Sequence, residues 1–409
     1  MSPSPPARSA APPAPYRWWM LAGVWLVYFS FGLTIAAMAP LVPRIEADLG
    51  LSHAAMGSIM GAWPLVYIAA AVPCGQLMDR LGPGRALLIA AGIILASSVA
   101  RAFASDHLTL FLAVALFGVG GPLISVGAPK TIATWFEGQE RGLAMGLYIT
   151  GPSLGSIVAL SATNAFVMPA LEQDWRATIL VYSLVSLAAG FAWFVISSRP
   201  QARHGDGVLA ATDATHSMTL LALARDPTVR LILLMSVGIF FFNHGLNNWL
   251  PELLRLGGMD SATAGLWASL PVAASVVSAV LVPRLATPPR RLPMLVGLFL
   301  AAAVATLSLH QTQPAVLALG FLLQGLARGA MLTIAMLLLV ELKAVGARKT
   351  GTAGGLFFSA AEVGGVLGPL TLGYLYDLTH GFDAALHLLT AICGLLIGLA
   401  LLVRRTLPR

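Results

Sequence analysis

Twelve long apolar stretches constrain the fold of this 409-residue chain more than any other feature. A helix needs about 20 apolar residues to cross the roughly 30 Å hydrocarbon core of a bilayer. The third and fourth stretches, and the ninth and tenth, follow one another closely, so ten or eleven spans is the alternative count. We expect an all-α polytopic membrane protein with twelve transmembrane helices. The predicted spans are 18–41, 54–78, 84–104, 107–130, 142–166, 176–197, 229–250, 261–283, 292–310, 314–340, 351–376 and 384–403.

Composition excludes several classes of protein. Charged residues make up only 10% of the chain and hydrophobic residues 57%, whereas about 25% of an ordinary soluble domain is charged. A soluble enzyme, a disordered chain and a disulfide scaffold are therefore excluded. Cys74 and Cys393 lie in separate apolar stretches, and we interpret both as packing residues. The sequence holds no metal-ligand cluster, nucleophile–base pair or ATPase motif, so we expect no metal, no cofactor and no enzymatic activity.

The distribution of positive charge predicts the topology. If the Pro- and Ala-rich tail over 1–17 is disordered and cytoplasmic, 19 Lys and Arg residues fall on the cytoplasmic side of the predicted spans. Only four fall on the other side: Arg44, Arg101, Arg176 and Arg255. Because Lys and Arg gather in cytoplasmic loops, we expect both termini in the cytoplasm and the chain in a bacterial inner membrane. The net charge of +7 is then a topology signal, so we expect a lipid bilayer and no nucleic acid as partner.

The chain divides into two similar halves. The longest hydrophilic stretch, 198–228, predicts a cytoplasmic linker between six-helix bundles over 18–197 and 229–403, followed by a cytoplasmic tail over 404–409. Residues 142–155 align without gaps to 351–364, so the fifth spans of the two halves correspond. Small residues at four-residue spacing let membrane helices approach closely, which favours two pseudo-symmetric bundles. The identical pairs are Gly142 and Gly351, Gly146 and Gly355, Leu147 and Leu356, and Gly155 and Gly364.

The loop between the second and third spans reads GQLMDRLGPGR over 75–85. It resembles the signature loop of the major facilitator superfamily, Gly-x-Leu-x-Asp-Arg-x-Gly followed by basic residues, except that Pro83-Gly84 stands where a basic residue often follows. The resemblance implies the two-bundle transporter fold of that family and a loop that acts as a latch, holding the cytoplasmic side closed. We assign to this latch Gly75, Asp79, Arg80, Gly82, Arg85 and, from the basic stretch before the fifth span, Arg141.

Three further segments point to branches of the family. Residues 135–146, WFEGQERGLAMG, are similar to a stretch of organic-anion and cyanate/nitrate-type porters, and 247–260 resemble the seventh-span exit of the cyanate-like branch. Residues 150–155, TGPSLG, partly resemble a Gly-Pro motif of drug/proton antiporters and favour that branch instead. The second span contains no Arg, so a nitrate site built from two arginines is not supported.

Two charged residues lie deep inside predicted spans, where charge is costly and usually functional. Arg328 is near the middle of the tenth span and Glu362 is at a similar depth in the eleventh. One hypothesis is that Arg328 binds an anionic group while Glu362 balances the charge and carries a proton. The alternative is a structural salt bridge between neighbouring helices.

Polar residues in the other spans complete the candidate site. In this fold the first, fourth, seventh and tenth spans line the central path. His244 can titrate, although a hydrogen-bonded packing histidine is the alternative, and the neighbouring asparagines suit either an outer gate or helix capping. The candidates are Tyr28, Thr34, Asn243, His244, Asn247 and Gln324.

These observations predict a monomeric secondary transporter of a small organic anion or zwitterion, coupled to protons, in which two bundles rock around a midplane site. A drug/proton antiporter is the second hypothesis, and the central Arg328 disfavours it. A membrane receptor without transport activity is the third, but it explains neither the latch nor the buried charges.

Overall fold

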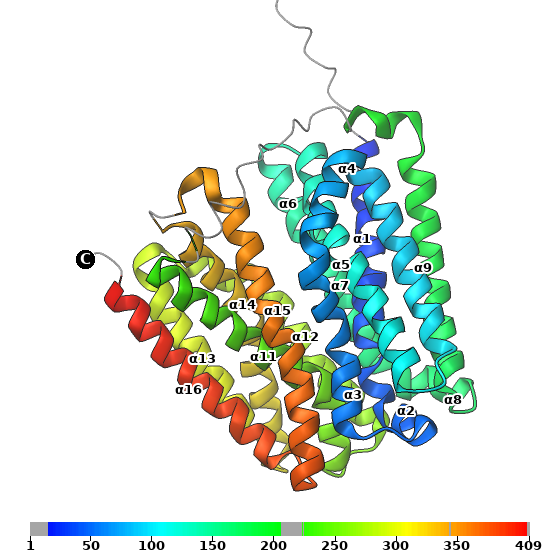
Figure 1. The fold of residues 1–409 in the computed structure, drawn as a ribbon, viewed down its shortest axis with the longest axis vertical. Helices are drawn as coiled ribbons and strands as arrows, with labels where there is room; N and C mark the ends of the chain where they lie inside the picture. The colour runs from blue at the N-terminus through cyan, green and yellow to red at the C-terminus, as the bar shows by residue number, and fades with distance from the viewer. Residues whose placement is uncertain (1–14, 206–222, 224, 343–344, 407–409) are drawn as a thin grey trace, which may run out of the picture.

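The computed structural model describes residues 15–205, 223, 225–342 and 345–406, and the regular secondary structure in this part of the chain is all helical (Figure 1). The first half contains α1 (Tyr16–Ala36), η1 (Ala39–Leu41), α2 (Val42–Leu49), α3 (His53–Met60), α4 (Ala62–Ala102), α5 (His107–Trp135), α6 (Gly138–Tyr148), α7 (Thr150–Ala162), η2 (Thr163–Val167), α8 (Met168–Ala170), α9 (Trp175–Ser197) and η3 (Pro200–Gly205). The second contains α11 (Pro227–Leu256), α12 (Ser261–Leu285), η4 (Pro288–Arg290), α13 (Arg291–Ser308), α14 (Pro314–Val340), α15 (Gly346–Thr379) and α16 (Asp383–Thr406).

The predicted number of spans is recovered once one continuous segment is divided. Within the described residues, eleven helical segments are long and apolar enough to cross a membrane. The second of them covers 50 residues, His53–Ala102, about 75 Å at 1.5 Å per residue and too long for one crossing. Gly82, with φ 75° and ψ 163°, interrupts α4 with a non-helical backbone, a conformation that favours glycine. The chain turns back there, which gives twelve spans.

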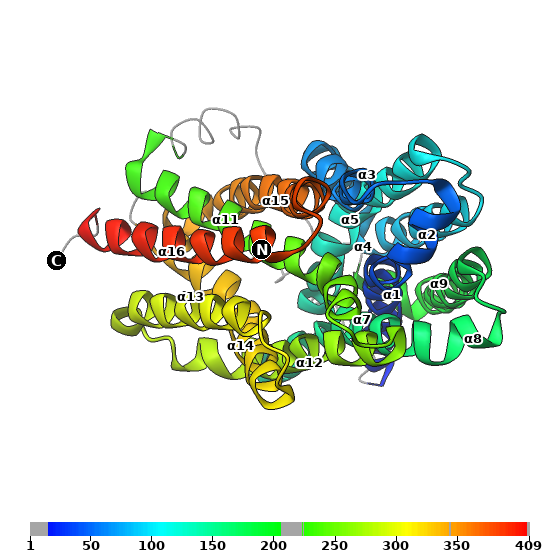
Figure 2. The same cartoon turned by 90° about the horizontal axis from the view of Figure 1, so that it is seen from below.

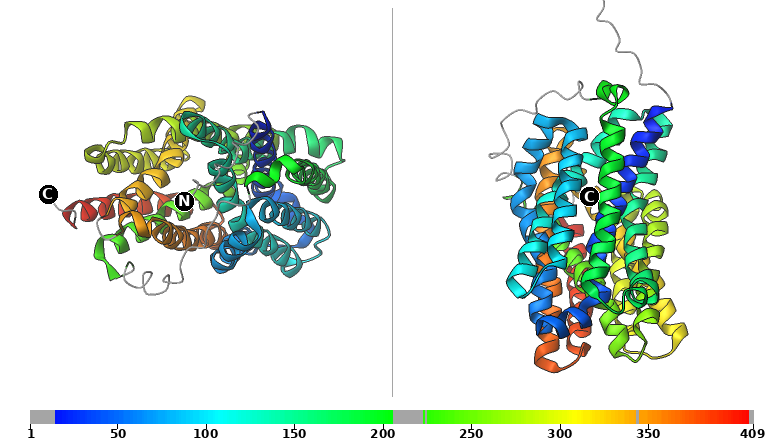
Figure 3. Two further views of the ribbon diagram at one scale, coloured as in Figure 1. Left: turned by 90° about the horizontal axis from the view of Figure 1, so that it is seen from above. Right: turned by 90° about the vertical axis from the view of Figure 1, so that its right-hand side faces the viewer.

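The two halves pack their helices in the same way. In the first half α1 packs on α7 and α4 on α9; in the second, α11 packs on α15 and α13 on α16. In spans, these are the contacts of the first with the fifth and the third with the sixth, repeated in each half. Figure 1 shows the second half tilted against the first, and the views in Figure 3 show the two groups of helices side by side. The fold is therefore two pseudo-symmetric six-helix bundles.

The aligned glycines explain this repetition. A Cβ on Gly155 would lie 2.1 Å from the carbonyl oxygen of Phe29, and a Cβ on Gly364 would lie 1.9 Å from that of Val237. Real Cβ atoms do not approach so closely, so each position needs glycine for its helix to meet α1 or α11. Gly146 and Gly355, one further pair of the alignment, have no such neighbour within 4 Å. The sequence repeat thus marks equivalent helix contacts in both halves.

The halves meet mainly at one end of the molecule. We call the end that holds Tyr16 and Thr406 the terminal side, and the other end the opposite side. On the opposite side α3 packs on α15 and α7 on α12, as Figure 2 shows from below. Gly57 fits against Pro369, whose carbonyl oxygen would be 2.4 Å from a Cβ there. Figure 1 shows the helices of the halves converging on this side and diverging toward the terminal side.

Several sequence predictions need adjustment or lie beyond the described residues. The first helix begins at Tyr16, so the predicted tail is two residues too long; residues 1–14 are outside the described part. The predicted linker over 198–228 is also largely outside it, and the bundle boundaries stay a prediction. Arg101, which we counted among the positive residues of the outer side, is only 3% exposed. Its Nη1 donates to the carbonyl oxygen of Thr34 at 2.9 Å, and its guanidinium lies over the Phe117 ring.

Candidate functional site

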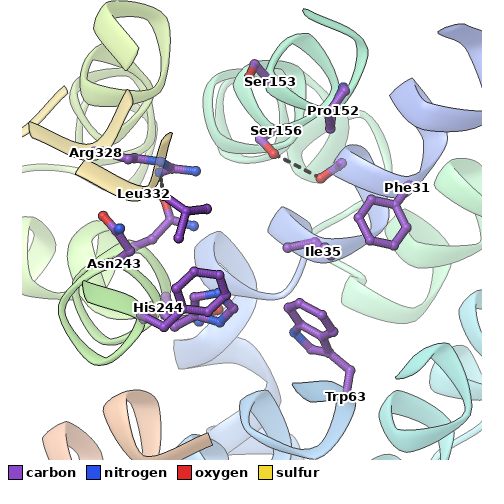
Figure 4. A pocket seen from close by; sticks show the side chains of 14 residues that line it. Phe31, Ile35, Trp63, Pro152, Ser153, Ser156, Asn243, His244, Arg328 and Leu332 are labelled. Carbon is purple, nitrogen blue, oxygen red and sulfur yellow. Dashed lines mark hydrogen bonds between the residues drawn. The ribbon is translucent and has the colours of Figure 1, made fainter. Parts of the chain in front are cut away.

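A cavity of about 300 Å³ lies between the two halves, the size of a small-ligand site. The first half supplies its wall from α1, α4 and α7, and the second supplies its wall from α11 and α14 (Figure 4). The first, seventh and tenth spans therefore contribute as predicted, but no residue of the fourth span, α5, lines it. The lining residues are Phe31, Gly32, Ile35, Trp63, Pro152, Ser153, Ser156, Phe240, Asn243, His244, Asn247, Asn248, Arg328 and Leu332.

The polar groups of the cavity come chiefly from the second half. Four of the predicted residues line it together, namely Arg328, Asn243, His244 and Asn247. A hydrogen bond from Arg328 Nη1 to Asn247 Oδ1 connects α14 with α11 and fixes one end of the guanidinium. Arg328 has five N–H donors, so donors remain for a ligand. The first half contributes apolar and aromatic side chains together with two serines, of which Ser156 bonds to the carbonyl oxygen of Gly32.

His244 connects the cavity to the other half of the molecule. Its imidazole stacks on Trp63 of the first half, with centroids 5.5 Å apart, and on Phe240 of its own helix, at 5.1 Å. Figure 4 shows Trp63 facing His244 across the cavity. Trp267 of α12 contacts Phe321 inside the second half, with ring centroids 5.7 Å apart, and does not line the cavity.

Glu362 lies behind the cavity wall. It is 4% exposed, and its Oε2 has no hydrogen-bond partner. A Cβ on Gly365 would lie 2.5 Å from that oxygen and 3.2 Å from Nδ1 of His244, so the carboxyl and the imidazole lie against the same glycine. No salt bridge joins Glu362 to Arg328, although both are described. His244 therefore lines the cavity together with Arg328 and also lies close to Glu362.

Three predicted site residues do not line the cavity. Tyr28 is stacked on Phe31, which does line it, and on Tyr148, each at 5.7 Å. Thr34 is buried, and its carbonyl oxygen accepts the bond from Arg101. Gln324 is buried on α14 one turn from Arg328. Hydropathy and helix position could not distinguish the cavity face of α1 or α14 from the faces packed inside each bundle.

The residues assigned to the latch contact their own half. The carboxylate of Asp79 accepts from Nζ of Lys130 on α5 at 2.7 Å. Arg141 donates to the carbonyl oxygens of Phe136 and Ala133 at the end of α5. A Cβ on Gly75 would meet nothing within 4 Å. Arg80 and Arg85 are exposed, and Gly82 forms the turn described above. No helix of the other half is therefore packed against Gly75, which lies on the terminal side, where the halves diverge.

Comparison with known protein families identifies the family of this chain. A model described as the Major Facilitator Superfamily matches residues 24–308 and, in a second overlapping match, 258–409. The chain belongs to the Major Facilitator Superfamily. It is therefore a multi-pass membrane transporter and not an enzyme, as the signature loop and the two-bundle fold indicated.

Similar members of the superfamily span nearly the same length. The chain is 27% identical over 376 residues to the uncharacterized transporter YycB of Bacillus subtilis, covering 91% of this chain and 90% of that protein. It is 25% identical over 380 residues to a probable L-galactonate transporter of Escherichia coli, covering 86% and 80%.

The fold of this superfamily member also matches a solved transporter structure. A bacterial homologue of the human lysosomal transporter Spinster superposes with a TM-score of 0.77 at 16% identity. The match covers 96% of this chain and 98% of that one. At this identity the likeness shows the shared fold.

Proposed function

We propose that this member of the superfamily is a secondary transporter that moves a small organic anion or zwitterion together with protons by alternating access. The observation that carries the proposal is the position of Arg328. It is the one Lys, Arg, Asp or Glu among the residues that line the cavity, and it lies at the junction of the two halves. A guanidinium with free donors binds carboxylate or sulfonate oxygens in a charge-assisted geometry. The similarity to a probable L-galactonate transporter supports an organic acid as the solute.

The surrounding side chains support the same class of solute. Asn243, Asn247 and Asn248 line the cavity beside Arg328 and offer both donors and acceptors, which suits hydroxyl groups next to an acid. A cationic drug would meet the Arg328 charge inside a confined space, so the geometry favours an anion transporter over a drug/proton antiporter. Residues 150–155, which partly resemble the antiporters, add no carboxylate to the cavity wall.

We also infer that the protein lies in a bacterial inner membrane with its terminal side in the cytoplasm. The imbalance of 19 against four positive residues across the predicted spans supports this orientation. In the described conformation the contacts between the halves then gather on the side away from the cytoplasm.

Uptake into liposomes tests the proposal. Purified protein is reconstituted, and the entry of labelled galactonate, other small carboxylic and sulfonic acids, and a cationic dye is followed with and without a pH gradient. We expect saturable uptake of at least one acid that is faster when the outside is acidic, and no movement of the dye. Dye movement driven by protons, without acid uptake, would instead identify an antiporter. The absence of any flux would support a receptor.

Glu362 is our proposed proton carrier. A buried carboxyl with one unpartnered oxygen beside His244 can take up and release a proton close to the ligand, and the amide of Glu362→Gln cannot. We expect Glu362→Gln to exchange the acid across vesicles in both directions but to lose the acceleration by a pH gradient. Glu137→Gln, which removes an exposed carboxylate outside the cavity, is the control and should keep it. A Glu362→Gln protein with a normal response to the gradient contradicts this role.

A further inference from the structure

His53, at the start of α3, joins the two halves on the opposite side. Its imidazole lies between two aromatic rings of the other half. The ring of Trp249 is 5.1 Å away at an interplanar angle of 4°, and that of Tyr376 is 3.7 Å away at 10°. One side chain of the first half is thus inserted between two of the second, in the region where the halves are in contact.

Carboxylates face both ring nitrogens of this histidine. Nδ1 is 3.4 Å from Oε1 of Glu46, in the same half, and Nε2 is 4.0 Å from Oε1 of Glu252, in the other half. Both Nε2 and Glu46 Oε1 are buried without a hydrogen-bond partner. A neutral imidazole donates from one nitrogen, whereas an imidazolium donates from both. Glu46 and Glu252 can each accept a hydrogen bond from one ring nitrogen, whereas a neutral His53 can donate only one of these two bonds.

Acidic groups outnumber basic ones around His53. Asp377 of the second half accepts from the backbone N–H groups of His53 and Ala54, at 3.1 and 2.8 Å, and so caps α3 from across the interface. Arg255 pairs with Glu252 through two hydrogen bonds of 2.8 and 2.7 Å. Three carboxyl groups and one guanidinium thus lie around the imidazole, together with the Tyr376 ring. Negative neighbours favour the charged form of a histidine and burial opposes it, so the protonation of His53 depends on how closely the carboxyl groups surround it.

We propose that His53 is a proton-binding site, and that its imidazolium form holds the two halves together on the opposite side. Once protonated, His53 pairs with Glu46 and Glu252 at the same time, and its charge lies between the faces of Trp249 and Tyr376 in a cation–π arrangement. Loss of the proton removes the bond to one carboxylate and the attraction to both rings. The contact between the halves is then weakened, and the opposite side opens.

The inference rests on the alternating-access part of the proposed function. It adds His53 as a site at which proton binding controls the conformation. This site is separate from Glu362, which lies beside the cavity. Under the proposed orientation, His53 is protonated from outside the cell, so acid outside favours closure on that side. A proton taken up there would accompany the change that exposes the cavity to the cytoplasm.

Distance measurements between the halves test the proposal. Spin labels are attached through Ser105→Cys in the first half and Thr312→Cys in the second, both exposed on the opposite side, while the native Cys74 and Cys393 are buried. Distances are measured by double electron–electron resonance in lipid nanodiscs without solute, between about pH 5 and pH 8. We expect the population with the short distance to grow as the pH falls, and His53→Gln to abolish this dependence.

Two further variants make the result specific. Glu46→Gln removes one negative neighbour and should move the midpoint of the transition to lower pH by about one unit; it also decides the matter if His53→Gln does not fold. His310→Gln is the matched control, because His310 pairs with Asp383 at 3.1 Å within one half, and it should leave the transition unchanged. The proposal is overturned if the distances do not respond to pH, or if the response survives in His53→Gln. Because no solute is present, this outcome is independent of whether the transported solute is an anion.

Discussion

The Arg328→Gln variant is expected to lose transport of the organic acid almost completely, with kcat/KM reduced by about 100-fold or more. Removing the charged partner of a ligand in a confined site costs roughly 2–5 kcal/mol, and each 1.4 kcal/mol is a factor of ten in affinity. The Arg328→Lys variant keeps the charge but not the planar fork, so we expect intermediate transport. Uptake into liposomes measures transport, and the thermal stabilisation of the protein by the acid measures binding. The two together show whether the variant fails to bind the acid or binds it without transporting it.

The control for this prediction is Arg44→Ala. Arg44 is exposed on the opposite side and bonds to Gln173 outside the cavity, so its removal changes the net charge equally and should leave transport intact. If Arg328→Gln transports at the normal rate with normal affinity, Arg328 does not bind the acid. If Arg328 only connects α14 to α11 through Asn247, the variant should instead show lower thermal stability with unchanged affinity in the protein that remains folded.

The second large effect concerns the repeated glycines. Gly155→Ala and Gly364→Ala each place a Cβ about 2 Å from a backbone carbonyl oxygen of the neighbouring helix, so the helices must separate. Overpacking of this kind typically costs about 1–3 kcal/mol, and for a chain of this length we expect the Tm in detergent to fall by about 1–4 °C. The two substitutions should be similarly harmful, because they affect equivalent contacts in the two halves.

The same alignment supplies the controls. Gly146 and Gly355 have open space where the Cβ would lie, and alanine favours a helix more than glycine does. Gly146→Ala and Gly355→Ala should therefore keep or slightly raise the Tm. Equal losses of stability in all four variants would mean that glycine is needed along these helices for a reason other than close packing.

The fold could be predicted from the sequence because membrane spans leave a strong signal. Apolar length gave the spans, loop charge gave an orientation, and the loop around Asp79 gave the family. The turn at Gly82 agrees with the sequence prediction, because its non-helical backbone divides α4 where the length limit of a membrane span requires a division.

The site could be predicted only in part. Arg328 stood out because a charge within an apolar span is rare, and the asparagines stood out as a cluster. Thr34 and Gln324 were misplaced because a single sequence does not show which face of a helix meets the cavity. The contacts of His53 gave no signal, because Glu46, Glu252 and Asp377 lie near the ends of spans, where charged residues are ordinary, and come together only when the halves meet.

The uneven contribution of the two halves to the cavity has a further consequence. The second half supplies the charged and amide groups, whereas the first supplies mostly Phe31, Ile35, Trp63 and Pro152. A bound acid would travel with the second half and slide along the first as the bundles rock. Affinity for the acid group would then depend on the second half of the protein, and selectivity for the shape of the solute on the first. Substitutions at Ile35 or Pro152 could redirect the protein to acids of another shape while its anion anchor stays intact, which makes the first half the natural target for engineering.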